Sequence, residues 1–244
     1  MKTSSFTLLL AALITVFLTS SSSSCSKEDK TPAPDLSKGY PDAFTNKMSP
    51  KKLANLKKAG ATIYEGQDPP ALDGIFKAVE FIYSDSDGID VGEKLTGFTD
   101  FQFSKFEDHN KQCLIDWAQW NDKDGSLIGI SEGGGKYFPM AGHGNNFTVD
   151  AAEQITDAKT GKKYDYYSFY SGQVTADGIR NWESGLYEVD QNDNITWIRI
   201  FHDTDNFLPR EIVKPGGRLS ARPVADVGGK SDSQLEQLIL HRHR

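Results

Sequence analysis

Short apolar and aromatic segments alternate with polar turns along the chain from residue 61 onward. The segments are rich in aromatic and β-branched residues, and clusters such as SDSDG, NDKDG and QNDN separate them, as is typical of strands joined by tight turns. In ITWIRIF (195–201) alternate side chains fall on opposite faces, with Trp197, Arg199 and Phe201 on one of them. The expected strands are 61–64, 74–83, 96–106, 112–120, 126–133, 136–142, 145–156, 163–174, 181–190 and 195–203.

About ten strands in succession, with no helix between them, predict a mainly β fold made of a single antiparallel meander. A sheet this large has edge strands that invite aggregation unless the sheet closes on itself or splits into two layers. Closure gives a β-barrel, which is the fold that we predict. Splitting gives a β-sandwich, which is the alternative.

The segments on either side of the strands have other patterns. SPKKLANLKKAG (49–60) predicts a short helix, because Ser49 suits the N-cap, Pro50 suits the first turn and a glycine closes the segment. The β-barrel domain is expected to cover residues 61–228. Residues 229–244 then form a C-terminal tail or a short helix.

The chain opens with an apolar run, Phe6 to Leu18, which has the length of a signal peptide and is too short to span a membrane. Residues 1–24 therefore predict a lipoprotein signal peptide, with Cys25 as the first mature residue and the carrier of the lipid. The alternative is an ordinary secretory signal cut between Ser20 and Ser24, since a serine lies three positions before the cysteine. Residues 25–48 are polar and contain prolines, which predicts a flexible tether.

Charge and cysteine content narrow the functional classes. Removing residues 1–24 takes Lys2 away, so that 26 basic and 34 acidic residues remain and the net charge is −8. No block of lysine and arginine stands out, which argues against nucleic acid as a partner. Cys113 is the one cysteine besides Cys25, so the mature chain has no internal disulfide, and its place in KQCLIDW predicts a buried strand position.

Few residues qualify as site candidates. Trp117, Trp182 and Trp197 fall in expected strands, and aromatic side chains at the mouth of a barrel commonly contact apolar ligands or sugars. These tryptophans are our candidate pocket residues. Asp203 and Asp205, in FHDTDNF (201–207), form an acidic cluster that is a weak candidate for a surface calcium ion.

Signatures of catalysis and of cofactor binding are missing from the sequence. GISEG (129–133) formally fits G-x-S-x-G, but a glycine-rich stretch follows it where a nucleophile elbow needs a helix. The histidines and cysteines have no spacing typical of a zinc site. The sequence therefore predicts no catalytic residue and no cofactor, and no metal centre apart from the weak calcium candidates Asp203 and Asp205.

Three stretches resemble uncharacterised surface lipoproteins of the Bacteroidetes: AGATIYEGQDPPALDGIFKA (59–78), GQVTADGIRNWESGLYEVD (172–190) and IRIFHDTDNF (198–207). In that group a short helix leads into T-I-Y-x-G-x-x-P-P and then a strand. The matching positions are Thr62, Ile63, Tyr64, Gly66, Pro69, Pro70, Gly74 and Phe76, and Lys27, Glu28 and Asp29 resemble the group's surface-export signal. The resemblance implies a lipocalin-like β-barrel, anchored by lipid in the outer membrane and facing the cell exterior.

The function predicted from these features is that of a non-catalytic surface lipoprotein. Its barrel would bind a small apolar or glycan ligand or a partner protein, while Cys25 attaches it to the lipid bilayer. A secreted hydrolase that uses paired carboxylates is one alternative, since the chain has 34 acidic residues. An architectural envelope protein without a ligand is the other. The sequence leaves the oligomeric state open.

Overall fold

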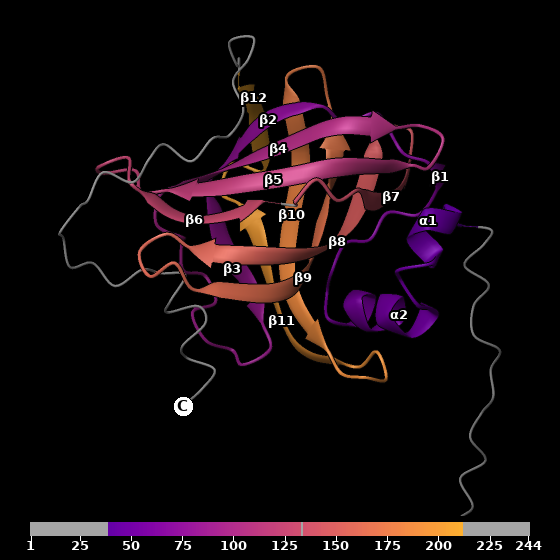
Figure 1. Cartoon of the computed structure of the whole chain (residues 1–244), viewed down its shortest axis with the longest axis horizontal. Coiled ribbons are helices and arrows are strands. Elements are labelled where there is room, and N and C mark those ends of the chain that lie inside the picture. The colour runs from indigo at the N-terminus through magenta and orange to yellow at the C-terminus, as the bar shows by residue number, and fades with distance from the viewer. Residues whose placement is uncertain (1–38, 133, 212–244) are drawn as a thin grey trace, which may run out of the picture. The chain divides into compact units, whose positions relative to one another are not determined.

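A computed structural model of the chain describes residues 39–132 and 134–211 (Figure 1). It confirms the mainly β fold. The helices are α1 (Asp42–Thr45) and α2 (Pro50–Lys58). The strands are β1 (Gln67–Asp68), β2 (Gly74–Ala78), β3 (Glu80–Asp85), β4 (Phe98–Glu107), β5 (Gln112–Trp120), β6 (Leu127–Glu132), β7 (Phe138–His143), β8 (Asn146–Asp157), β9 (Lys163–Val174), β10 (Gly178–Val189), β11 (Ile195–Asp203) and β12 (Phe207–Glu211).

The sheet closes into an antiparallel barrel of eight strands, so the barrel is confirmed and the sandwich is not formed. Around the barrel the order is β2, β4, β5, β6, β8, β9, β10 and β12, and β12 pairs with β2 to complete the ring. Because this order follows the chain, the expected meander is confirmed. β7 pairs with β5 and β8, while β11 pairs with β10 and carries β3 on its outer edge.

The segment GIFKAVEFIY forms two strands instead of the expected one, and the break falls at Val79. The amide of Val79 donates to Oδ2 of Asp203 at 2.8 Å, and its carbonyl accepts from the amide of Thr204 at 2.8 Å. Both backbone groups of Val79 are thus satisfied outside a strand ladder. As a result β2 pairs with β4, whereas β3 turns away to pair with β11.

Two further strand predictions differ from the structure. ATIY (61–64) is not a strand, because its amides bond to side chains: Thr62 N–H donates to Glu183 at 2.7 Å and Tyr64 N–H to Thr148 at 2.8 Å. Conversely, β12 was not expected, since FLPRE is short and Pro209 lacks the amide that a central strand needs. β12 nevertheless closes the barrel, between β10 and β2.

One cluster of apolar side chains fills the barrel interior. Its fully buried members include Phe103, Phe147 and Trp182, together with the Cys113 thiol, whose pKa is raised by burial. The buried strand position expected for Cys113 is therefore confirmed. A barrel of about eight strands is just wide enough for side chains to fill it, and here they fill most of it.

A second cluster lies on the outside of the barrel, where α1 and α2 pack against it (Figure 1). Leu53 and Leu56 of α2 meet Ile198 and Ile200 of β11 in this cluster. The helix expected at 49–60 is confirmed as α2: Ser49 Oγ accepts from the amide of Lys52 at 3.1 Å, and Pro50 occupies the first position.

The flexible tether was expected to extend to residue 48, but the chain is already packed from residue 39. Tyr40, Phe44 and Met48 are at most 2% exposed and belong to the outer cluster. Phe44 lies on α1, Tyr40 precedes this helix and Met48 follows it. The domain therefore begins earlier than the polar composition of the segment suggested.

Several predictions concern residues that the structure does not describe. The signal peptide (1–24), Cys25 and the C-terminal tail (229–244) all lie outside the described residues. Within residues 39–132 and 134–211, no helix is long and apolar enough to cross a membrane.

Candidate ligand-binding pocket

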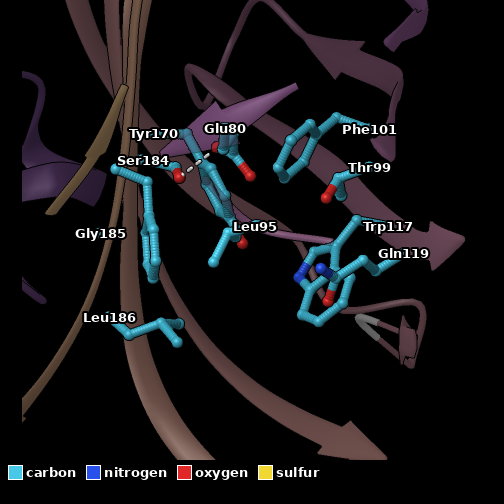
Figure 2. A pocket seen from close by; sticks show the side chains of 11 residues that line it. Glu80, Leu95, Thr99, Phe101, Trp117, Gln119, Tyr170, Ser184, Gly185 and Leu186 are labelled. Atoms are coloured by element: carbon cyan, nitrogen blue, oxygen red, sulfur yellow. Dashed lines mark hydrogen bonds between the residues drawn. The ribbon is translucent and has the colours of Figure 1, made fainter. Parts of the chain in front are cut away.

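A small pocket of about 50 Å³ lies between strands β4, β5, β9 and β10 of the ring and strands β3 and β11 outside it. Figure 2 shows side chains from both sides of the barrel turned toward it. Two of its lining residues, Leu95 and Leu186, are partly exposed, so this end of the pocket adjoins solvent. The lining residues are Glu80, Leu95, Thr99, Phe101, Trp117, Gln119, Tyr170, Ser184, Gly185, Leu186 and Phe201.

Glu80, the first residue of β3, is the acidic group of the pocket and is only 5% exposed. Its Oε1 accepts hydrogen bonds from Trp182 Nε1 at 2.9 Å and from Ser184 Oγ at 2.7 Å, the second of which Figure 2 marks. Burial raises the pKa of Glu80, and these hydrogen bonds oppose that effect only in part. The nearby carboxylate of Asp203 raises it further.

Glu153 of β8 is a second carboxyl group in the barrel interior, 4% exposed, and it does not line the pocket directly. Its Oε2 accepts from Tyr170 at 2.7 Å, Ser168 at 2.8 Å and Trp117 at 3.4 Å. Its Oε1 is buried and has no hydrogen-bond partner among the described residues. Burial raises the pKa of Glu153.

Tyr170 and Trp117 connect Glu153 to the pocket wall, since both line the pocket and both donate to Glu153. Burial first, and then the charge of Glu153, raise the pKa of the Tyr170 hydroxyl well above its usual range, so it remains a donor. The ring of Trp182 stacks on Tyr170 with centroids 5.9 Å apart and lies 4.7 Å from Phe101. This packing fixes the orientation of the aromatic wall.

The three candidate tryptophans have different positions. Trp117 lines the pocket, and Trp182 lies behind it as the donor to Glu80. Trp197, although on the same face of β11 as the pocket residue Phe201, packs against Tyr166 at 6.1 Å and is not part of the lining. The structure thus brings Trp117 and Trp182 to one site and leaves Trp197 out of it.

The weak calcium candidates, Asp203 and Asp205, take part in hydrogen bonds with the backbone. Both oxygens of Asp203 accept amide protons: Oδ2 from Val79, and Oδ1 from Asp205 at 2.9 Å and Phe207 at 3.2 Å. Asp205 therefore contributes its amide to this turn. In the described part of the chain, no group of three or more histidine, cysteine, aspartate or glutamate side chains could hold a metal ion.

The three stretches that carry the family resemblance meet at one buried carboxylate, Glu183 of β10. Thr62 donates to it through its amide at 2.7 Å and its hydroxyl at 2.9 Å, and His202 Nε2 lies 3.1 Å from it. Each stretch contributes one of these residues. These contacts join the segment after α2 to the outer face of the barrel, so Thr62, Glu183 and His202 have a structural role.

Of the residues that line the pocket, sequence reasoning identified only Trp117, and it missed both Glu80 in the lining and Glu153 behind it. Glu80 lies in the apolar run GIFKAVEFIY, and Glu153 shares a strand face with Val149, Ala151 and Ile155. An acid among apolar residues on an inward face is unusual, since burying a charge without a partner is costly. That pattern was a signal for both glutamates, but the pairing of β3 with β11 was needed to place Glu80.

Replacement of Glu153 by glutamine tests the cost of this buried acid. Because the folded protein raises the pKa of Glu153, the folded state binds its proton more tightly than the unfolded state does. The free energy of unfolding should therefore fall as pH rises above about 4.3, the ordinary pKa of a glutamate, until the carboxyl group ionises in the folded state. Urea unfolding between pH 4 and pH 9 should show Glu153→Gln gaining stability relative to the wild type as pH rises.

Glu65 serves as a control, because its pKa is shifted in the opposite direction. It is exposed, and the hydrogen bond from Lys57 at 2.6 Å lowers its pKa. Glu65→Gln should therefore lose a little stability relative to the wild type as pH rises through the usual carboxyl range. Parallel pH curves for Glu153→Gln and the wild type would contradict the assignment of Glu153 as a costly buried acid.

Comparison of the chain with models of protein families, with curated proteins and with solved structures finds no match. The resemblance to Bacteroidetes surface lipoproteins and to lipocalins therefore stays a prediction. What the fold and the site define is a class: a closed β-barrel with a small aromatic pocket, one buried carboxyl group in its lining and a second bonded to two of the lining residues.

Proposed function

We propose that the chain is a surface lipoprotein whose barrel binds a small, largely apolar ligand without catalysis. A β-barrel of this kind is compatible with ligand binding. The observation that carries the proposal is the pocket beside Glu80, where rings from Phe101, Trp117, Tyr170 and Phe201 converge with a few polar groups. Ligand sites in proteins are typically concave and mostly apolar, with a small number of placed polar groups.

The size of the pocket favours a small group over a glycan. A cavity of about 150 Å³ holds benzene, and this pocket has about 50 Å³. It therefore suits the end of a ligand, with the remainder lying along the partly exposed Leu95 and Leu186. A sugar ring would need the pocket to widen.

The carboxylate-based hydrolase has less support. Glycosidases place two carboxyl groups on either side of the bond that is cleaved, and both must reach the substrate. Glu80 lines the pocket, whereas Glu153 lies behind Tyr170 and Trp117 and accepts hydrogen bonds from both. The pair therefore does not flank a shared open space.

The alternative of an architectural envelope protein without a ligand is supported by the filled interior of the barrel. Variants that block the pocket distinguish this alternative from ligand binding. Tryptophan at Leu186 should fill the pocket, because Leu186 lines it. Mass spectrometry of small molecules that co-purify with the protein from its own host should find a ligand on the wild type and at least ten times less of it on Leu186→Trp. Thr196→Trp, on the exposed side of β11, should keep the ligand. Wild-type preparations that are repeatedly empty would contradict ligand binding.

The second part of the proposal is attachment to the outer membrane through lipidated Cys25, with the barrel on the cell exterior. Its support is the apolar run before Cys25 and the polar stretch after it. Palmitate labelling in the host should be lost in Cys25→Ala and kept in Cys113→Ala, since Cys113 is buried in the barrel. Unchanged labelling of Cys25→Ala would overturn the anchor.

A further inference from the structure

We propose that the ligand of the pocket carries an ammonium group, which binds between the carboxylate of Glu80 and the rings of Trp117 and Tyr170. The inference rests on the proposed ligand-binding function and specifies the chemistry of the ligand. Its basis is a mismatch of charge inside the barrel, where acids are present without cationic partners.

The two interior carboxyl groups have only neutral donors around them. Glu80 accepts from Trp182 and Ser184, and Glu153 accepts from Trp117, Ser168 and Tyr170. Within the part of the chain that the structure describes, neither glutamate forms an ion pair with lysine, arginine or histidine.

The other well-buried carboxylates of the barrel show what this chain does elsewhere. Asp150 pairs with Lys52, Asp85 with Arg199, and Glu183 lies beside His202. Two others use backbone donors: Asp203 accepts three amide protons, and Asp157 accepts from the amide and hydroxyl of Thr160. Buried charges in proteins are generally paired, because an isolated one is costly. Among the described residues, Glu80 and Glu153 have no cationic partner and accept from neutral side chains, and Glu80 lines the pocket. A cation in the pocket would supply the missing partner for Glu80.

The aromatic wall suits the same ligand. The face of an aromatic ring is negative, and a cation within about 6 Å of a Trp, Tyr or Phe ring is attracted to it, more strongly where water is excluded. Phe101, Trp117, Tyr170 and Phe201 all line the pocket. A carboxylate with several aromatic rings is a recurring arrangement for ammonium groups, and it disfavours an anion.

The dimensions define the ligand further. About 50 Å³ accommodates a small head group, such as a primary or singly methylated ammonium. Leu95 and Leu186, at the partly exposed end, would contact a short apolar chain attached to that head group. The class that fits is therefore a small alkylamine or an amphiphile that ends in an amine.

Three probes with the same chain and different head charge test the inference: n-butylammonium, 1-butanol and butyrate. Titration of the wild-type protein is followed by the indole N–H signals of ¹⁵N-labelled tryptophan in NMR spectra. Trp117 and Trp182 adjoin the site and should shift, whereas Trp197 should not. We expect n-butylammonium to bind with a millimolar Kd and at least tenfold more tightly than 1-butanol, and butyrate to bind most weakly.

The outcomes separate the inference from the proposed function. If 1-butanol binds in the pocket as tightly as n-butylammonium, the pocket binds ligands but the inference about charge is overturned. Tighter binding of butyrate would overturn it as well. If none of the probes shifts the Trp117 signal, both the inference and the proposed pocket fall.

Glu80→Gln and Glu183→Gln form a matched pair of variants. Both glutamates are buried, 5% and 4% exposed, but Glu183 faces the segment after α2 and does not line the pocket. In Glu80→Gln the preference for n-butylammonium over 1-butanol should fall about tenfold, while 1-butanol still binds. Glu183→Gln should keep the preference. A preference that survives Glu80→Gln would contradict the role of Glu80, and the wild-type series remains decisive if that variant does not fold.

Discussion

Replacing Lys52 with methionine is expected to lower the free energy of unfolding by about 3–5 kcal/mol, which is the usual cost of breaking a buried ion pair by removing one partner. Lys52 lies on α2 and is 4% exposed, with its Nζ 3.1 Å from Oδ2 of Asp150 on β8. The same Nζ lies 4.7 Å from the ring centroid of Tyr167 and 5.2 Å from that of Tyr187. The variant would leave Asp150 buried without its cation.

The burial of Asp150 explains why the effect should be large. Burial raises its pKa, and the charge of Lys52 and the hydrogen bond from Tyr187 at 2.5 Å oppose that shift. Without Lys52, Asp150 must either stay ionised at greater cost or take up a proton. Either result weakens the attachment of α2 to the barrel, because this pair spans the outer cluster.

Two further variants test this account of Lys52. Lys51→Met, at the exposed neighbouring position, should change the free energy of unfolding by less than about 0.5 kcal/mol. The double variant Lys52→Met with Asp150→Asn should recover at least half of the loss, since no uncompensated charge remains. Chemical denaturation of all four proteins gives these values. A loss in Lys52→Met no larger than that in Lys51→Met would show that the pair is not a stabilising link.

The sequence was sufficient to predict the strands and their meander, because strand patterns and turn clusters are local signals. It favoured the barrel but kept the sandwich as an alternative, since closure depends on the pairing of β12 with β2. The alternation in ITWIRIF correctly separates Ile198 and Ile200, which face the helices, from Phe201, which lines the pocket. Ser49 and Pro50 likewise mark the start of α2 through local backbone chemistry. Elements whose hydrogen bonds form between residues close in sequence could therefore be predicted from the local sequence pattern.

The elements that were missed depend on distant partners. β12 is a strand only because β10 and β2 lie on either side of it, and ATIY is irregular because Glu183 and Thr148 take its amides. The packed segment around Tyr40, Phe44 and Met48 has a polar composition, and only the outer face of the barrel gives its three apolar residues a place. Composition alone therefore placed the start of the domain too late.

The pocket was only partly predictable for the same reason. Trp117 was identified as a pocket residue, but its neighbours Glu80 and Tyr170 come from β3 and β9, which are far apart in the sequence. The break at Val79, which sends β3 toward β11, depends on a hydrogen bond to Asp203 across the fold. No local pattern encodes that contact, so Glu80 could be noticed as an acid in an apolar run but could not be assigned to the pocket.

Trp182→Ala is expected to lower the free energy of unfolding by about 3–5 kcal/mol, the usual cost of removing a large aromatic side chain from a core. Trp182 is 1% exposed and is the largest of the fully buried side chains among the described residues. It contacts the rings of Phe101, Phe103 and Tyr170, with centroids 4.7 Å, 6.3 Å and 5.9 Å away. Since domains of this kind have a total stability of about 5–15 kcal/mol, the loss should be a large part of the whole.

The indole N–H of Trp182 adds a second contribution, because it donates to Glu80 at 2.9 Å. Trp182→Phe keeps most of the ring packing and removes this donor, so it should lose about 1–3 kcal/mol, the cost of leaving a buried acceptor with fewer partners. The same variant should raise the pKa of Glu80 further, because one of the hydrogen bonds that stabilises its ionised form is gone. The stability difference between Trp182→Phe and the wild type should therefore increase as pH rises.

Trp120→Ala serves as the control, since Trp120 lies on β5 and is partly exposed. It should lose less stability than Trp182→Ala when thermal and urea unfolding are compared at one pH. In the pocket, Trp182→Ala should also shift the indole N–H signal of Trp117, because Tyr170 and Phe101 lose the ring that holds them in place. Equal losses for Trp182→Ala and Trp120→Ala, with an unchanged Trp117 signal, would mean that the aromatic stack does not support the pocket.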